Sequence, residues 1–285
     1  MLQIKVEATS ANVCVGFDVL GISLKLYNTF TFKKSNDFSF VGFLDEYSNI
    51  NNNMVYDSYS YVFKTLNKEI IPVEIGFSGD IPVSRGLGSS SSLIVAGVFA
   101  ANYMLNNPLS KDECFTICAK LEGHPDNVAP AIYGGLIASF KDDLGYHPIR
   151  YEVSNKLKFI TIIPPFKLKT EDARGVLPKM LEYKDIVNNL SRIVNIPYAF
   201  KLGDIKLIKQ LFNDKLHEPY RKKLIKGYDE IKEAIKDLDV ALAISGSGST
   251  MLLISYDTSV IEKIKFLNYD IKVLEVGSGI NIKEV

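Results

Sequence analysis

The feature that most constrains this chain is a Gly/Ser-rich turn between an apolar strand and an apolar helix. Residues 82–93 read P-V-S-R-G-L-G-S-S-S-S-L. Before the turn, Val73, Ile75 and Phe77 alternate with polar or small residues, which is the period of a half-buried strand. After it, residues 93–105 form an apolar run that is long enough for a buried helix and too short to span a bilayer. The sequence therefore predicts a strand, a tight turn and a buried helix in direct succession.

The turn has the composition of a loop that binds phosphate. Gly86 and Gly88 have no Cβ, so the backbone can turn sharply and approach a ligand closely. The serines open the helix, where unpaired N–H groups and the positive end of the dipole favour an anion. Two known phosphate signatures do not fit this turn: the lysine of a P-loop is absent, and Ser91 stands where a dinucleotide-binding fingerprint has its third glycine. A flexible Gly/Ser linker is disfavoured as well, because a linker has polar surroundings and this run lies between two core elements. We predict another kind of nucleotide loop, formed by Pro82, Val83, Ser84, Arg85, Gly86, Leu87, Gly88, Ser89, Ser90, Ser91 and Ser92.

Composition limits the classes of partner. The 285 residues are 47% apolar and 23% charged, which is typical of a soluble globular enzyme with room for two domains. Lys and Arg total 33, as do Asp and Glu, so neither nucleic acid nor a membrane is predicted as a partner. The first residues resemble a strand rather than a signal peptide, and Cys114 and Cys118 fit a buried helix face better than a metal site. We expect a reduced, cytoplasmic protein.

The hydrophobic pattern predicts strands mixed with helices, and a domain boundary near residues 150–157. Ser110 and Glu113 fit a capping box, which predicts a helix that ends at Glu122. A carboxylate at the negative end of a helix is electrostatically unfavourable, and this favours a functional role for Glu122 over a solvated helix end. The other expected elements are strands at 4–8, 136–140, 159–163, 240–244 and 251–254, a loop at 9–12, and helical segments at 55–66, 184–195, 204–215 and 220–237.

Several polar motifs interrupt these elements, and together they resemble the GHMP kinase superfamily. Residues 8–21 read A-T-S-A-N-V-C-V-G-F-D-V-L-G, residues 124–130 read H-P-D-N-V-A-P, and residues 245–250 read S-G-S-G-S-T. With the turn at 82–90 they stand in the order that the superfamily has. Segments A-R-G-V-L-P and H-E-P-Y-R, which contain Arg174 and Arg221, resemble the homoserine kinase branch. The chain departs from the usual pattern at Glu7, Val13-Cys14-Val15 and Ser249.

The resemblance implies an α+β fold with the two-domain GHMP kinase architecture. Residues 1–153 would form an ATP-binding domain like the second domain of ribosomal protein S5, and residues 154–285 a ferredoxin-like domain, with the active site between them. The implied reaction is ATP-dependent phosphorylation of L-homoserine to O-phospho-L-homoserine in threonine biosynthesis, and homodimers are common in the family. Two alternatives remain: a kinase for another small alcohol such as mevalonate or shikimate, and an inactive nucleotide-binding module. The module would be expected to have lost Ser89 or Glu122, and both are present.

The resemblance also assigns roles. The hydroxyl of Ser89 and the carboxylate of Glu122 would hold Mg²⁺, which prefers hard oxygen ligands. Arg174 and Arg221 would bind the substrate carboxylate, and Asp18 would bind its ammonium. Asn12 would hold the substrate hydroxyl by hydrogen bonding. The other residues that the resemblance places near the substrate are His124, Asn127 and Thr170.

The chemical step itself would involve Asn12, Asp126 and Arg174. Some GHMP relatives use the position of Asp126 as a general base, whereas homoserine kinases are usually described as having no dedicated base. Phosphoryl transfer depends mainly on positioning and charge stabilisation, so a base is not obligatory. The histidines His124, His147 and His217 lie far apart in the sequence, so no catalytic zinc is expected.

Overall fold

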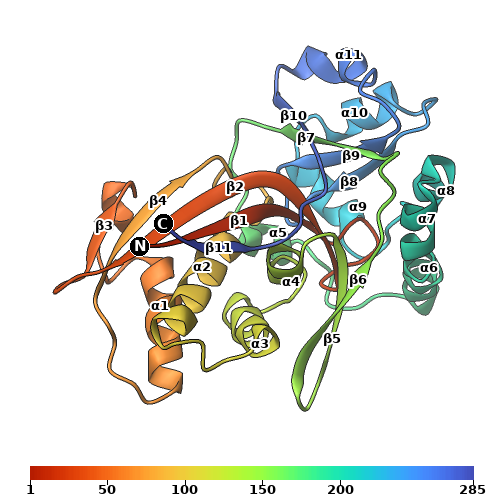
Figure 1. The fold of residues 1–285 in the computed structure, drawn as a ribbon. Coiled ribbons are helices and arrows are strands. Elements are labelled where there is room, and N and C mark those ends of the chain that lie inside the picture. The colour runs from red at the N-terminus through yellow and green to blue at the C-terminus, as the bar shows by residue number, and fades with distance from the viewer.

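Two β-sheets organise the chain in the computed structural model, which describes residues 1–285 (Figure 1). In the first sheet the order β11-β1-β2-β4-β3 is extended by β5 on β2 and by β6 on β5. Its strands are β1 (Leu2–Ala11), β2 (Leu20–Lys34), β3 (Ser39–Val41), β4 (Val73–Gly79), β5 (Leu136–Asp142), β6 (Gly145–Tyr151) and β11 (Asn281–Glu284). The second sheet has the order β10-β7-β9-β8 and comprises β7 (Lys158–Ile163), β8 (Ala241–Ile244), β9 (Met251–Ser255) and β10 (Asp270–Leu274).

The end of the chain returns to the first sheet. β11 pairs antiparallel with β1, and Leu2 lies opposite Glu284. The two termini consequently lie next to each other (Figure 1). The division predicted between residues 153 and 154 falls in the connection from β6 to β7, although the last strand belongs to the first sheet.

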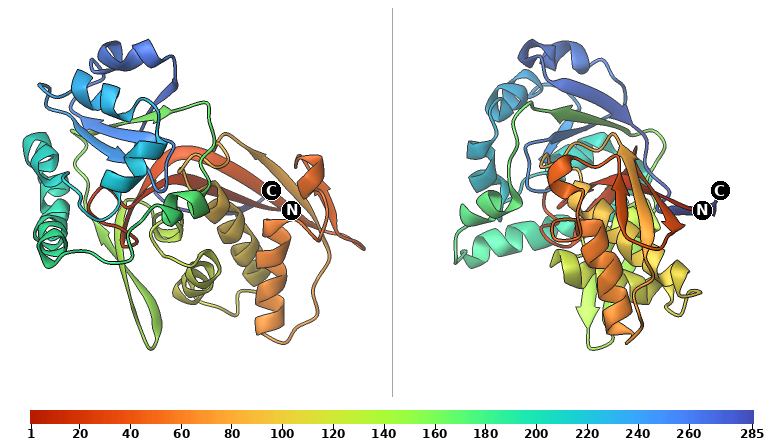
Figure 2. Two further views of the ribbon diagram at one scale, coloured as in Figure 1. Left: turned by 180° about the vertical axis from the view of Figure 1, so that it is seen from behind. Right: turned by 90° about the vertical axis from the view of Figure 1, so that its left-hand side faces the viewer.

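Four helices cover one face of the first sheet, as Figure 2 shows from two further directions. The capping box predicted at Ser110 is confirmed, since its hydroxyl accepts from the backbone N–H of Glu113 and the Glu113 carboxylate accepts from that of Ser110. Cys114 and Cys118 are buried in the core beneath the sheet, as predicted. The helices are α1 (Met54–Thr65), α2 (Ser89–Met104), α3 (Lys111–Glu122) and α4 (Val128–Tyr133), and η1 (Asp45–Tyr47) is a short 3₁₀ turn before α1.

Shorter helices surround the second sheet, and two elements of the chain differ from their predicted bounds. The strand expected at residues 4–8 runs on to Ala11 because β2 continues to pair with it, so the turn begins only at Asn12. The helix expected at 220–237 is broken by Gly227, whose φ of 89° no continuous helix allows. These elements are α5 (Thr170–Gly175), α6 (Tyr183–Ile193), α7 (Ile196–Leu202), α8 (Ile205–Leu211), α9 (Glu218–Arg221), η2 (Lys222–Leu224), α10 (Tyr228–Ala234), α11 (Ile261–Ile264) and η3 (Lys265–Leu267). None of the helices combines the length and the apolar character that a membrane crossing requires.

Candidate active site

One cavity of about 430 Å³ brings the sequence motifs together. Residues from the β1–β2 connection, the start of α2, α5, α9 and the loop at 245–250 all line it. Four residues of the predicted nucleotide loop do not: Pro82, Leu87, Ser91 and Ser92. Leu87, Ser91 and Ser92 are fully buried instead. The predicted site residues that do line the cavity are Asn12, Asp18, Val83, Ser84, Arg85, Gly86, Gly88, Ser89, Glu122, His124, Asp126, Asn127, Thr170, Arg174 and Arg221, and Ser90 lies among them.

The glycines of the turn are required by close backbone packing. Gly86 and Gly88 have φ angles of 75° and 71°, in the left-handed region. A Cβ on Gly86 would overlap the carbonyl oxygen of Ser245, and one on Gly88 would overlap the hydroxyl of Thr9. Ser245 also donates its hydroxyl to the Gly86 carbonyl at 2.6 Å. The turn thus presses against the loop at 245–250, and two distant motifs form one wall of the cavity.

The start of α2 supplies free hydrogen-bond donors at the same wall. Gly88 is the N-cap residue and no side chain caps the helix. The first backbone bond of the helix runs from the N–H of Ser92 to the carbonyl of Gly88 at 3.0 Å. The N–H groups of Ser89 and Ser90 precede that bond, and both residues line the cavity. Together with the helix dipole they suit an anion such as phosphate.

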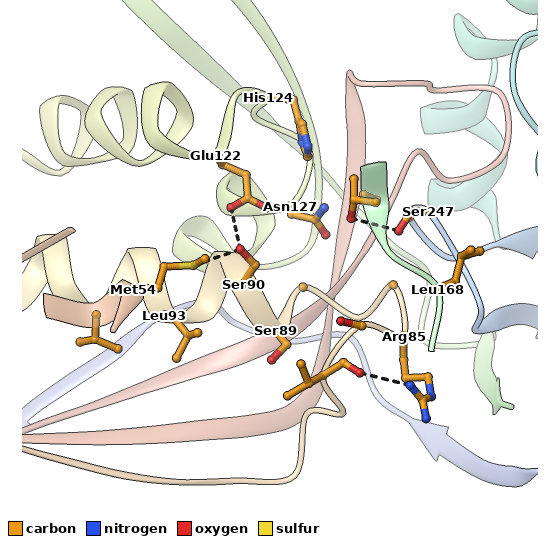
Figure 3. A pocket seen from close by; sticks show the side chains of 18 of the residues that line it. Met54, Arg85, Ser89, Ser90, Leu93, Glu122, His124, Asn127, Leu168 and Ser247 are labelled. Atoms are coloured by element: carbon orange, nitrogen blue, oxygen red, sulfur yellow. Dashed lines mark hydrogen bonds between the residues drawn. The ribbon is translucent and has the colours of Figure 1, made fainter. Parts of the chain in front are cut away.

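Glu122 lies across from these serines at the end of α3. Its Oε1 accepts from the Ser91 hydroxyl at 2.8 Å, and its Oε2 lies 3.4 Å from the Ser90 hydroxyl. Figure 3 shows Ser90 pointing toward Glu122 and Ser89 pointing away from it. Burial raises the pKa of Glu122 above its usual range, and the hydrogen bond from Ser91 opposes that rise. The hydroxyl beside this carboxylate within the cavity is therefore that of Ser90, which the sequence analysis placed only among the phosphate contacts.

His124 and Asp126 form a tightly bonded pair behind Glu122. Nδ1 of His124 lies 2.6 Å from Oδ1 of Asp126, whose side chain is almost fully buried. Burial lowers the pKa of His124, but the hydrogen bond to Asp126 and the negative charges of Asp126, Glu122 and Asp18 together outweigh burial, so this pKa lies above its usual value. One ligand atom each of Asp18, His124 and Asp126 lie within 4.8 Å of one another. The cavity therefore has a polar end where acidic and basic groups converge.

Two of the predicted substrate ligands are paired with each other. Both oxygens of Asp18 accept from the Arg174 guanidinium, at 2.8 and 3.1 Å, although 156 residues separate the two. Asn12 holds the β1–β2 connection, which carries Asp18, against the loop at 245–250. Its Oδ1 accepts from the N–H of Asp18 at 3.0 Å, and its Nδ2 donates to the carbonyl of Gly246 at 2.8 Å. Beside the pair, the Thr170 hydroxyl lies 3.3 Å from that of Ser247. Asp18 and Arg174 are each about one-third exposed, so both face the cavity.

Arg221 is the other predicted carboxylate ligand, and it is a buried cation. Only 2% of the residue is exposed. Nε donates to the carbonyl of Ala173 and Nη1 to that of Gly246, each at 3.1 Å, and no carboxylate forms an ion pair with it. Burial lowers the pKa of Arg221, and the nearby charge of Arg174 lowers it further. Because buried charges are normally paired, this arrangement suits an anionic ligand.

The opposite end of the cavity is apolar, and the sequence analysis did not find it. Phe43 stacks on Phe77 with ring centroids 5.1 Å apart, which brings the η1 segment against β4. Asn53 holds the segment in place by accepting from two N–H groups of α1 and donating to the carbonyl of Tyr47 at 2.7 Å. A run of asparagines next to aromatic residues was the available signal. The residues that line this end are Phe43, Leu44, Tyr47, Asn51, Asn52, Asn53, Met54, Val55, Phe77 and Leu93.

Comparisons with known proteins agree with this geometry. The model of the GHMP kinases N-terminal domain matches residues 53–135, and that of the GHMP kinases C-terminal domain matches residues 198–269. Homoserine kinase from Clostridium beijerinckii is 41% identical over 257 residues, which cover 89% of this chain and 86% of that protein. Homoserine kinase from Clostridium botulinum is 38% identical over 285 residues, covering 97% of this chain and 95% of the relative. This chain belongs to the homoserine kinase family.

A solved structure extends the similarity over the whole fold. Homoserine kinase from Cytophaga hutchinsonii superposes with a TM-score of 0.85 at 28% identity, over 99% of this chain and 97% of that one. The predicted α+β class and GHMP kinase architecture are confirmed. As a member of the homoserine kinase family, the chain is a small-molecule kinase that uses ATP.

Proposed function

We propose that the chain transfers the terminal phosphoryl group of ATP to the side-chain hydroxyl of L-homoserine, as a step of threonine biosynthesis. The observation that carries this proposal is the group of charges at the polar end of the cavity. Arg221 is a buried cation without a carboxylate, and it lies beside the ion pair of Asp18 and Arg174. A substrate that has one carboxylate and one ammonium matches this set of charges.

The existing ion pair favours a zwitterion over an anion. When an amino acid binds, its ammonium replaces Arg174 as the partner of Asp18. Its carboxylate then pairs with the guanidinium groups of Arg174 and Arg221. No charged group is left unpaired in this exchange. Mevalonate and shikimate carry a carboxylate but no ammonium, so they would leave Asp18 without a partner in a partly buried site, which costs free energy.

The rest of the cavity fits ATP. The aromatic and apolar side chains around Phe43 and Phe77 suit a purine ring, while the asparagine amides beside them offer donors and acceptors to its edge. The N–H groups at the start of α2 suit the phosphates. His124 and Asn12 lie at the polar end, where a substrate hydroxyl would meet the terminal phosphate.

A magnesium ion fits the pairing of Glu122 with a serine hydroxyl. Both groups offer hard oxygen ligands, and Mg²⁺ typically takes one or two protein ligands together with phosphate oxygens. The ion would supply charge neutralisation on the phosphates. Ser89 is the residue that the family motif assigns to this role, whereas Ser90 lies beside Glu122. Alanine variants of the two serines decide between them.

We expect Asp126→Asn to lower kcat by about tenfold or less. Asp126 accepts a hydrogen bond from His124, and an asparagine oxygen can accept the same bond. Its role in the proposal is therefore to orient His124, while positioning and charge stabilisation drive the transfer. Steady-state kinetics on the purified variant test this, since loss of a general base typically costs about 10²–10⁴-fold. A loss of that size would make Asp126 the base.

A panel of alcohols in an assay coupled to ADP formation tests the proposed function. L-homoserine, mevalonate and shikimate are compared at equal ATP and Mg²⁺, and the phosphorylated product is identified by mass. We expect the highest kcat/KM with L-homoserine. A preference for mevalonate would overturn the proposal, and ATP binding without turnover of any alcohol would favour an inactive nucleotide-binding module. A cytoplasmic location stays a prediction from the composition and the N-terminal sequence, and a homodimeric assembly stays a prediction of the family resemblance.

A further inference from the structure

His217 is a buried histidine that the proposed mechanism does not use. It precedes α9, four residues before Arg221, and none of its surface is exposed. Its Nε2 lies 2.6 Å from the carbonyl oxygen of Cys14, and its Nδ1 lies 3.4 Å from Nη1 of Arg221. The ring thus connects the β1–β2 connection to the guanidinium that faces the substrate cavity.

These two contacts allow one protonation state. A carbonyl oxygen only accepts, so Nε2 of His217 must carry the hydrogen. A guanidinium only donates, so Nδ1 must be free to accept. Both contacts are satisfied by the neutral ring with its hydrogen on Nε2. Burial lowers the pKa of His217, which agrees with a neutral ring.

Phe17 completes the arrangement. Its ring stacks on that of His217 with centroids 5.3 Å apart and planes 28° apart. The guanidinium carbons of Arg221 and Arg174 lie 5.2 and 5.7 Å from the centroid of the same ring. The face of an aromatic ring attracts cations, so one ring stabilises two arginines that otherwise repel each other.

We propose that His217 and Phe17 are positioning residues, which orient Arg221 and Arg174 for the carboxylate of the substrate. His217 accepts from Arg221 on one side and is anchored to Cys14 on the other, while Phe17 supports the ring and both guanidiniums. This inference rests on the proposed function, because the carboxylate is that of the amino-acid substrate. It assigns His217 no contact with substrate and no part in phosphoryl transfer.

Protonation of His217 disrupts the arrangement. A hydrogen on Nδ1 would point at the donors of Arg221, and two cations would then face each other at 3.4 Å. The pKa is lowered in the folded protein, so the ring is neutral above that pKa and becomes charged as the pH falls through it. The KM for homoserine is therefore expected to rise toward low pH.

Other charged groups face the same ring. Oδ2 of Asp214 lies 3.8 Å from Nε2 of His217. The negative charges of Asp214 and Asp18 raise the pKa of His217, and the positive charge of Arg221 lowers it. The adjacent Glu218 accepts from the N–H of Ile244 at 2.7 Å, and burial raises the pKa of Glu218 to about 7. A rise in KM at low pH can be assigned to His217 only if it disappears with the imidazole.

Two substitutions of His217 test the proposal. His217→Leu removes the acceptor, and we expect the KM for homoserine to rise about ten- to a hundredfold, with the KM for ATP near wild type. His217→Asn places an amide oxygen near the position of Nδ1. This variant should therefore have a KM for homoserine within about threefold of wild type, and that KM should no longer rise at low pH. His147→Leu, at a partly exposed histidine outside the cavity, is the matched control.

A substitution of Phe17 keeps the proposal testable if His217→Leu does not fold. Phe17→Leu leaves the hydrogen bonds of Arg221 in place and removes the aromatic face, so the KM for homoserine should rise about three- to tenfold. Equal losses for homoserine and ATP in these variants, or a rise in KM at low pH that persists in His217→Asn, would overturn the inference. Absence of homoserine turnover by the wild-type protein would instead overturn the proposed function.

Discussion

Replacement of Arg221 by methionine is expected to raise the KM for homoserine by about 10²- to 10³-fold, with ATP affinity close to wild type. Loss of one partner from a buried charge pair costs about 2–5 kcal/mol, and each 1.4 kcal/mol is a factor of ten. Arg221 has no carboxylate of the protein as partner, so its removal leaves no protein anion unpaired. The loss therefore falls on the substrate, and steady-state kinetics with both substrates measure it.

Two controls separate this effect from a general loss of structure. Arg150→Met removes an exposed arginine of β6 that makes no ion pair, and it should leave the kinetics and the thermal midpoint unchanged. 3-Aminopropan-1-ol is homoserine without its carboxylate. Wild type should strongly prefer homoserine over this amine, and Arg221→Met should lose most of that preference. A variant that keeps the full preference would exclude Arg221 as a carboxylate ligand.

The Gly/Ser-rich turn at residues 82–92 could be predicted from the sequence because local rules determine it. Two glycines after a period-2 strand and before an apolar helix leave few alternatives, and both glycines have the positive φ that such a turn requires. The capping box and the buried cysteines of α3 were likewise local patterns. The turn, the capped helix and its apolar face were therefore predicted correctly.

The contacts between motifs could not be predicted in this way. Asp18 meets Arg174 only because the β1–β2 connection packs against α5, and the sequence analysis assigned the two residues to the substrate without foreseeing their ion pair. The apolar end of the cavity depends similarly on the contact of Phe43 with Phe77. Both arrangements follow from tertiary packing, for which a single sequence has no local signal.

The position of the serines illustrates the same limit within one helix. Successive residues of an α-helix point about 100° apart, since 3.6 residues make one turn. Ser89, Ser90 and Ser91 therefore point in different directions, and the packing of α3 against α2 decides which of them meets Glu122. The motif identifies the serine cluster, whereas the structure shows the hydroxyls of Ser90 and Ser91 beside that carboxylate.

The expected effect of Glu122→Gln is a fall in kcat of about 100-fold together with a higher Mg²⁺ concentration for half-maximal rate. The neutral amide keeps the size of the side chain and removes the charge that attracts a cation. Stabilisation of the charge on the transferring phosphoryl group is then weaker, and single groups of this kind are worth about 10²–10³-fold in rate. Titration of the rate with Mg²⁺ at saturating ATP and homoserine measures both quantities, and Glu69→Gln, at an exposed glutamate, is the control.

The two serines extend this test to the second ligand. Ser90→Ala should shift the Mg²⁺ dependence in the same direction as Glu122→Gln, because the Ser90 hydroxyl lies 3.4 Å from Oε2 of Glu122. Ser89→Ala should shift it less, since Ser89 points away from that carboxylate (Figure 3). Both alanines keep the backbone N–H groups that we propose bind the phosphates, so ATP affinity should change little. The reverse order would assign the ion to Ser89, and a wild-type Mg²⁺ dependence in Glu122→Gln would show that this carboxylate does not hold it.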